Sequence, residues 1–266
     1  MSLTTEEWVH RAYKKLKHAA YFDKTQLPLV DKLVDFEAVD IRQLKTVIDA
    51  LDSRDKGVWD DLVSDIIDKL DILIYPKKLR RWDDSHVIFN TDNEPVEMER
   101  AQYFIDLPVL GHLLGVLWIV TIGAQMDDRR NAEKASMYEH SYGNRLRKSL
   151  LNEDDEITFS PYLFEPYFSQ YQRWRDTALS YAEQRLDAKQ DALILTLDLR
   201  SFFYSVHIHK EKYDGILNQV DMTGLPTWTR RVHKFVYTVL EAYSKKLRDI
   251  NRDPNLDLGE RVVSAQ

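Results

Sequence analysis

Eight consecutive residues near the three-quarter point of the chain combine a carboxylate with aromatic rings: Leu197-Asp198-Leu199-Arg200-Ser201-Phe202-Phe203-Tyr204. They follow an uncharged apolar run, residues 192–196, whose length and composition predict a buried β-strand. A carboxylate at the end of a buried strand is costly unless a cation or a metal ion neutralises it. The pattern therefore indicates either a metal-binding Asp198 or a strand-capping aspartate followed by aromatic core residues.

A second segment with candidate chemistry lies upstream: Ser141-Tyr142-Gly143-Asn144-Arg145-Leu146-Arg147-Lys148-Ser149. It places three cations within four residues, just after a glycine. Guanidinium groups bind phosphate in a bidentate manner and lysine supplies a point charge, so the segment suits a turn that holds a triphosphate. Taken alone, such a cluster is more typical of a solvated turn than of a phosphate site.

Together, and in this order, the two segments resemble motifs of reverse transcriptases, especially the bacterial group II-like and defence-associated members. The basic segment resembles a fingers motif, and the pattern Asp-Leu-x-x-Phe-Phe resembles the first palm motif. The resemblance implies an RNA-directed DNA polymerase that uses two-metal catalysis. It also implies deoxynucleoside triphosphates as substrates, an RNA or DNA template and primer as partners, and a role in antiviral defence.

The resemblance also implies roles for individual residues. Asp198 would be catalytic and would bind Mg²⁺ (or Mn²⁺) together with the backbone carbonyl of Leu199. Phe203 would pack beneath the sugar of the incoming nucleotide. Arg145, assisted by Arg147 and Lys148, would hold the triphosphate.

The resemblance covers roughly residues 75–220, and the chain departs from the family after it. The template-grip motif and the Tyr/Phe-x-Asp-Asp hairpin of the family are missing after Asp198. The pairs Asp83-Asp84 and Asp127-Asp128 precede Asp198, so their use would require a permuted palm. We therefore expect the N-terminal part of a longer polymerase, inactive on its own. The alternative is a non-catalytic, polymerase-like binding or scaffold module.

The composition of the 266 residues is that of a soluble globular protein, with 44% hydrophobic and 30% charged residues. The absence of cysteine excludes a disulfide scaffold, a thiol nucleophile and a cysteine-ligated metal site. The first residues lack the pattern of a signal peptide, and we expect a cytoplasmic protein without a membrane partner. Residues 107–124 are long and apolar enough to mimic a membrane span, but a buried helix is favoured. The net charge of −7 is unusual for a phosphate-binding protein, so binding would depend on local cation clusters.

The periodicity of the chain predicts a helix-rich α+β fold in three parts. A helical N-terminal extension (1–70), with Thr4 and Asp40 as N-caps, precedes fingers (71–190) and a partial palm (191–266). Short strands are expected over residues 71–75, 85–90 and 96–104, with a turn at Pro76-Lys77-Lys78. Further helices are expected from Pro166, Lys210 and Pro226. The aromatic stripe of the helix that begins near Pro166 is expected to pack in a core rather than to stack on bases.

Overall fold

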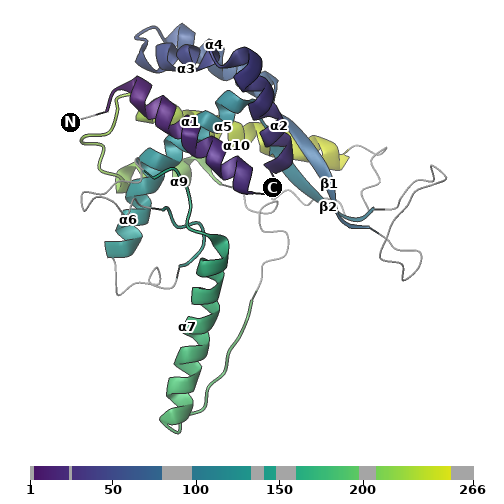
Figure 1. Ribbon diagram of the computed structural model, residues 1–266, viewed down its shortest axis with the longest axis vertical. Coiled ribbons are helices and arrows are strands. Elements are labelled where there is room, and N and C mark those ends of the chain that lie inside the picture. Colours follow the sequence, from purple (N-terminus) through teal and green to yellow (C-terminus); the bar gives the residue numbers. More distant parts are fainter. Residues whose placement is uncertain are drawn as a thin grey trace, which may run out of the picture.

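The computed structural model describes residues 3–23, 26–79, 98–132, 141–147, 160–197 and 208–252. This part of the chain is a helix-rich α+β structure with one antiparallel pair of strands (Figure 1). Its elements are α1 (Thr5–Phe22), α2 (Leu27–Asp35), α3 (Gln43–Asp52), α4 (Lys56–Asp68), β1 (Asp71–Leu79), β2 (Met98–Asp106), α5 (Val109–Trp118), α6 (Ala124–Ala132), α7 (Tyr167–Asp187), α9 (Lys210–Asp214) and α10 (Thr229–Arg252). Short π-helical or 3₁₀ segments span Phe36–Asp40, Ile119–Gly123 and Gly215–Gln219.

Side-chain caps fix the starts of two N-terminal helices. The Thr4 hydroxyl accepts a 3.2 Å hydrogen bond from the Glu7 amide, and the Glu7 carboxylate accepts one of 2.8 Å from the Thr4 amide. This capping box confirms the prediction for α1. Asp55 caps α4 in a similar way, through the amide of Gly57. The prediction for Asp40 is wrong, because the chain continues α2 through a π-helical segment that ends at Asp40, and α3 begins only at Gln43.

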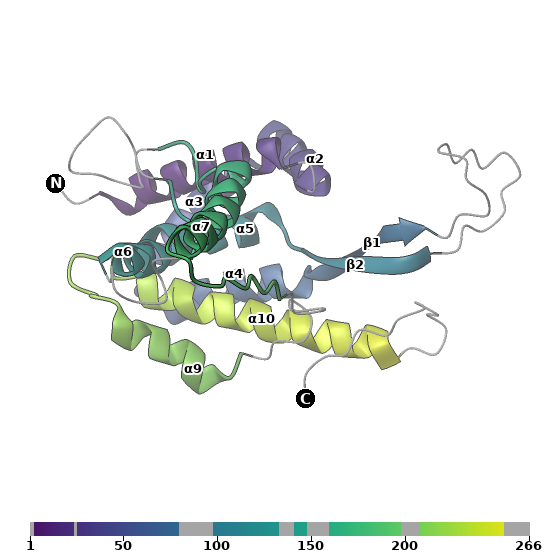
Figure 2. The ribbon, with the colours of Figure 1, turned by 90° about the horizontal axis from the view of Figure 1, so that it is seen from below.

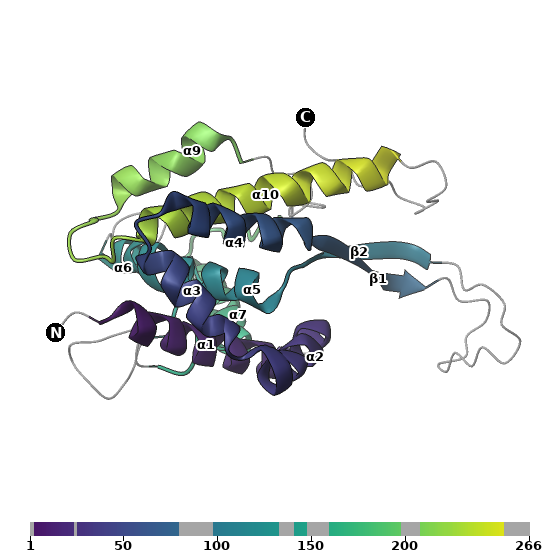
Figure 3. The same ribbon diagram turned by 90° about the horizontal axis from the view of Figure 1, so that it is seen from above.

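The N-terminal helices share one hydrophobic core with α5 and α10. Val9 of α1, Val47 of α3, Leu113 of α5 and Val232 of α10 are all inaccessible to solvent in one cluster. Figures 2 and 3 show α10 on one side of this body and α1 on the other. The expected buried helix over 107–124 is confirmed as α5 and its π-helical continuation. The helix Val109–Arg129 is apolar and long enough to cross a membrane, yet 56% of its apolar window is buried within the protein.

The two strands form a hairpin-like antiparallel pair that packs along α10. Asp71 pairs with Asp106 and Tyr75 pairs with Gln102 in the register. Strand β1 continues through Pro76 to Leu79, with an irregularity between Pro76 and Lys78, so the predicted turn at 76–78 is wrong. A proline is tolerated in a strand at such an irregularity. The predicted strand over 85–90 lies outside the described residues.

Helix α7 begins directly after Pro166, as predicted, and projects away from the rest of the molecule (Figure 1). The chain then returns beside α7 as residues 191–197, which form no regular secondary structure and are exposed. Leu193, for example, is 92% exposed. The prediction of a buried strand over 192–196 is therefore wrong for this structure: in the described chain, no strand lies beside this segment to pair with it and cover it. The predicted starts near Lys210 and Pro226 agree with α9 and α10.

Candidate functional site

A large pocket of about 1230 Å³ lies where α1, α2, the β1–β2 pair and the start of α7 meet. Residues 142–144 and Arg147, from the basic segment, line one part of it. Most of its other lining groups are apolar, and several are aromatic rings: Tyr75, Phe104, Tyr162, Phe164, Tyr171 and Trp174. A mainly apolar cavity with a few placed polar groups is the usual form of a ligand site.

The backbone of the basic segment is held by a short antiparallel bridge. Leu146 and Phe164 pair, the Arg147 amide donates to the Leu163 carbonyl at 3.2 Å, and the Glu165 amide donates to the Arg145 carbonyl at 2.8 Å. Just before the bridge, Asn144 has a φ of 53°, in the left-handed region that asparagine tolerates better than most residues. The predicted basic turn therefore exists, and the bridge fixes its position.

Arg145 points into the protein. Its Nε lies 2.6 Å from the Asp127 carboxylate on α6, and its Nη1 donates to the Ser141 carbonyl at 3.3 Å. The side chains of Arg145 and Asp127 are only 17% and 7% exposed. Arg145 does not line the pocket. The predicted triphosphate contact of Arg145 stays a prediction, and within the described chain this residue anchors the turn to α6.

Arg147, by contrast, stands at the wall of the pocket. Its guanidinium carbon lies 4.0 Å from the centre of the Tyr162 ring, in a cation–π contact. His18 of α1 meets the same ring edge-on, at a centroid distance of 4.2 Å. Burial, together with the charges of Arg147 and Lys15, lowers the pKa of His18. This shift favours the neutral form of His18, whereas the guanidinium of Arg147 carries a permanent charge at the pocket wall.

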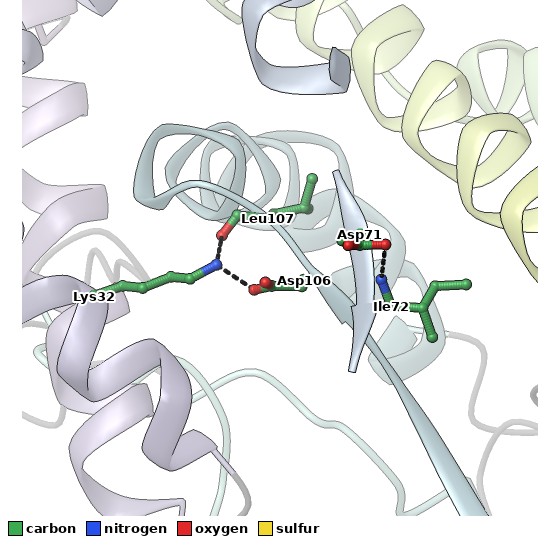
Figure 4. A network of polar contacts seen from close by, with 5 residues as sticks. All are labelled: Lys32, Asp71, Ile72, Asp106 and Leu107. Carbon is green, nitrogen blue, oxygen red and sulfur yellow. Dashed lines mark hydrogen bonds and ion pairs between the residues drawn. The ribbon is translucent and has the colours of Figure 1, made fainter. Parts of the chain in front are cut away.

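A second polar network lies at the end of β2 (Figure 4), where Lys32 and Asp106 line the pocket. The Lys32 ammonium forms an ion pair with Asp106 and donates to the Leu107 carbonyl at 3.2 Å. The neighbouring His112 also lines the pocket, and burial lowers its pKa to about 4, with a smaller contribution from the charge of Lys32. His112 is thus a neutral polar group here, able to donate or accept a hydrogen bond.

The aromatic stripe of α7 is exposed, so the prediction that it packs in a core is wrong. Tyr167 and Phe168 are 72% and 78% exposed, and Gln170 is the one buried side chain of α7. The rings contact one another instead: the ring centroids of Tyr167 and Tyr171 are 6.0 Å apart, and those of Tyr171 and Trp174 are 5.6 Å apart. Tyr167, Phe168, Tyr171 and Trp174 all line the pocket, so their exposed faces are available for stacking.

Four of the predicted site residues lie outside the described residues: Lys148, Asp198, Leu199 and Phe203. Their predicted roles at a metal ion and an incoming nucleotide stay predictions. Within the described ranges, no group of three or more His, Asp or Glu side chains is arranged to hold a metal ion.

No family model, curated protein or solved structure matches the chain. A functional assignment therefore depends on the geometry of the pocket and on the resemblance of the two segments to reverse transcriptase motifs.

Sequence reasoning missed Lys15, Tyr162 and His18, which surround Arg147. A signal for Lys15 was present, because it lies three residues after Ala12 and one before Leu16, on the apolar face of α1. A lysine on such a face marks a buried ammonium or a side chain that extends to the surface. No comparable pattern distinguishes Tyr162, whose position depends on a loop.

Proposed function

We propose that this chain forms the fingers and the first part of the palm of a reverse transcriptase-like polymerase, and that the pocket binds the incoming deoxynucleoside triphosphate. The proposal depends on one observation above all: the basic segment that resembles a fingers motif opens onto an aromatic pocket, with Arg147 at its wall.

The chemistry of Arg147 supports a phosphate contact. The face of the guanidinium packs on the Tyr162 ring. The N–H groups at the edge of the guanidinium can therefore donate to a phosphate oxygen that lies in the guanidinium plane. The ring also limits the freedom of the arginine side chain, which reduces the entropy lost when a ligand binds. The exposed rings nearby suit the other end of a nucleotide, because bases stack on aromatic side chains. We therefore assign the main phosphate contact to Arg147, with Lys148 and Arg145 as further candidates.

Two exposed apolar surfaces support the assignment to part of a larger polymerase. The aromatic row of α7 and residues 193–197 are the kinds of surface that a folded protein covers. In the proposal, further palm strands pair with residues 192–197 and pack on α7, which places Asp198 at a sheet edge. The complete enzyme would bind Mg²⁺ through Asp198 and the Leu199 carbonyl, and Phe203 would screen the sugar. The sequence has no Asp-Asp pair after Asp198, and in the proposal the isolated chain does not extend a primer.

Titration of the purified chain with dATP and Mg²⁺, monitored by calorimetry, tests the nucleotide site. Arg147→Ala removes a charge-assisted contact and should weaken binding by about 10- to 100-fold. Arg175→Ala is the matched control, since Arg175 lies on an exposed part of α7 beside Asp176 and away from the pocket lining. The control should bind like the wild type. Equal affinities in all three proteins, or no binding in any of them, would contradict the proposal.

A further inference from the structure

One lysine of α1 is buried without a carboxylate in its hydrogen bonds. Lys15 is 1% exposed and lies on the same helix face as Ala12 and Leu16, whereas the adjacent Lys14 is exposed. A buried ammonium carries a large desolvation cost, and an apolar side chain at the same position would avoid it. A specific set of acceptors must therefore compensate this cost.

The acceptors come from a segment far away in the sequence. The Lys15 Nζ donates to the carbonyl of Tyr162 at 2.9 Å and to the carbonyl of Ser160 by a second short hydrogen bond. The Tyr162 amide in turn donates to the Ser160 hydroxyl at 3.2 Å, which tightens the turn between the two carbonyls. Hydrogen bonds to a charged group are stronger than neutral ones, so the ammonium is an effective clamp for this turn.

The turn that Lys15 holds leads into the residues that contact Arg147. The Tyr162 ring supports the Arg147 guanidinium at 4.0 Å, and the next residue, Leu163, accepts the Arg147 amide at 3.2 Å. The side chain of Arg147 is thus held by Tyr162, whose carbonyl Lys15 binds, and its backbone is held by Leu163, the next residue in the chain. His18, one helical turn after Lys15, packs against the other part of the same ring.

We propose that Lys15 is a positioning residue, which clamps residues 160–162 onto α1 and thereby holds Arg147 in place at the wall of the pocket. The nucleotide part of this inference rests on the proposed function, whereas the clamp itself does not. The N-terminal helices, in this view, set the geometry of a site whose contact residues lie more than a hundred positions later in the chain.

Lys15→Met removes the ammonium but keeps an unbranched side chain, and Lys14→Met on the exposed neighbouring position is the matched control. Hydrogen exchange reports on the clamp without any ligand. In Lys15→Met, the amides of Arg147 and Glu165, which bridge the two segments, should exchange about tenfold faster or more, given the loss of a charge-assisted contact. Amides in the core of α5 should exchange as in the wild type, and Lys14→Met should change neither set.

The dATP titration on the same variants separates the clamp from the ligand. We expect Lys15→Met to weaken dATP binding about tenfold, and Lys15→Gln, whose amide can donate to one carbonyl, to restore part of the affinity and of the protection. If Lys15→Met fails to fold, Lys15→Gln alone provides the comparison. Unchanged exchange at Arg147 and Glu165 in a folded variant overturns the clamp. Faster exchange at these two amides supports the clamp, whatever the result of the dATP titration. If neither Lys15→Met nor Arg147→Ala alters dATP binding, only the proposed nucleotide site is refuted.

Discussion

The two arginines of the basic segment have different surroundings, although they are separated by a single residue. Arg145 lies in a nearly buried ion pair with Asp127, while Arg147 stacks on Tyr162 at the pocket. The sequence shows the cluster of cations but not which of them faces a ligand, because that depends on a bridge between residues 146 and 164. The distinction affects how each substitution should be interpreted.

Arg145→Ala should destabilise the folded chain by about 3–5 kcal/mol, because it leaves the Asp127 carboxylate buried without its partner. Urea unfolding gives the free energy. Asp127→Ala in the same background should recover part of the loss, since the unpaired charge is then removed. Arg147→Ala should cost no more than about 1 kcal/mol, the scale of an exposed cation–π contact. Equal losses for the two arginines would show that the ion pair is not the anchor of the turn.

At the scale of elements, the sequence predicts the helices well where an amphipathic face meets a core. The Thr4 capping box, the apolar α5 and the α10 stripe with Val232 and Phe235 all appear as expected. Two of the errors concern apolar segments that are largely exposed in the described chain, and the others concern the cap at Asp40 and the turn at 76–78. The hydrophobic periodicity and composition of residues 192–196 and of the α7 stripe favour burial. They do not show whether another part of the protein is present to cover these segments. Of the site, the sequence predicted only the basic segment, because the other walls come from elements that are far apart in the chain: α1, α2, β1, β2, α5 and α7.

The exposure of the α7 aromatic row has a direct consequence for stability. Phe168→Ala on α7 should change the free energy of unfolding by less than about 0.5 kcal/mol, because little buried surface is lost. Phe235→Ala on α10, a residue that is 2% exposed in the core, should cost about 3–5 kcal/mol. Urea denaturation of both variants measures the difference. A loss of several kcal/mol for Phe168→Ala would mean that α7 packs against the body in solution.

At the scale of the whole molecule, the N-terminal helices, α5 and α10 form one body, and α7 with residues 191–197 extends from it (Figure 1). The N-terminal helices are therefore part of the main core, and they also hold the basic turn through Lys15. The predicted division into an extension, fingers and a partial palm stays a prediction. Buried titratable groups within this body make its stability depend on pH.

His112 should make the protein less stable in mild acid. Burial lowers its pKa from 6.5 to about 4 in the folded state. Between these values the unfolded chain takes up a proton that the folded chain does not, so stability falls as the pH decreases from 6.5 to 4. His112→Leu should reduce the proton uptake on unfolding by about one proton in this range. Urea midpoints measured from pH 4 to 7 give the slope, and an identical slope in the variant would rule out His112 as its source.

The opposite end of the pH range reports on Lys15. Burial lowers the pKa of Lys15 from 10.5 to about 8, so the unfolded chain holds the extra proton between these values. Stability should therefore increase as the pH rises from 8 to 10.5, and Lys15→Met should lack this increase. The same urea series, extended to alkaline pH, measures it. A parallel rise in Lys15→Met would assign the effect to other groups.

A photoreactive nucleotide shows directly whether the pocket is the nucleotide site. Photolysis of the chain with 8-azido-dATP and Mg²⁺, followed by peptide mass spectrometry, identifies the residues next to the base. We expect labelling within residues 160–174, where Tyr162, Tyr171 and Trp174 line the pocket, with loss of the label in excess dATP and in Arg147→Ala. Labelling confined to other parts of the chain, or labelling here that dATP does not displace, would contradict it.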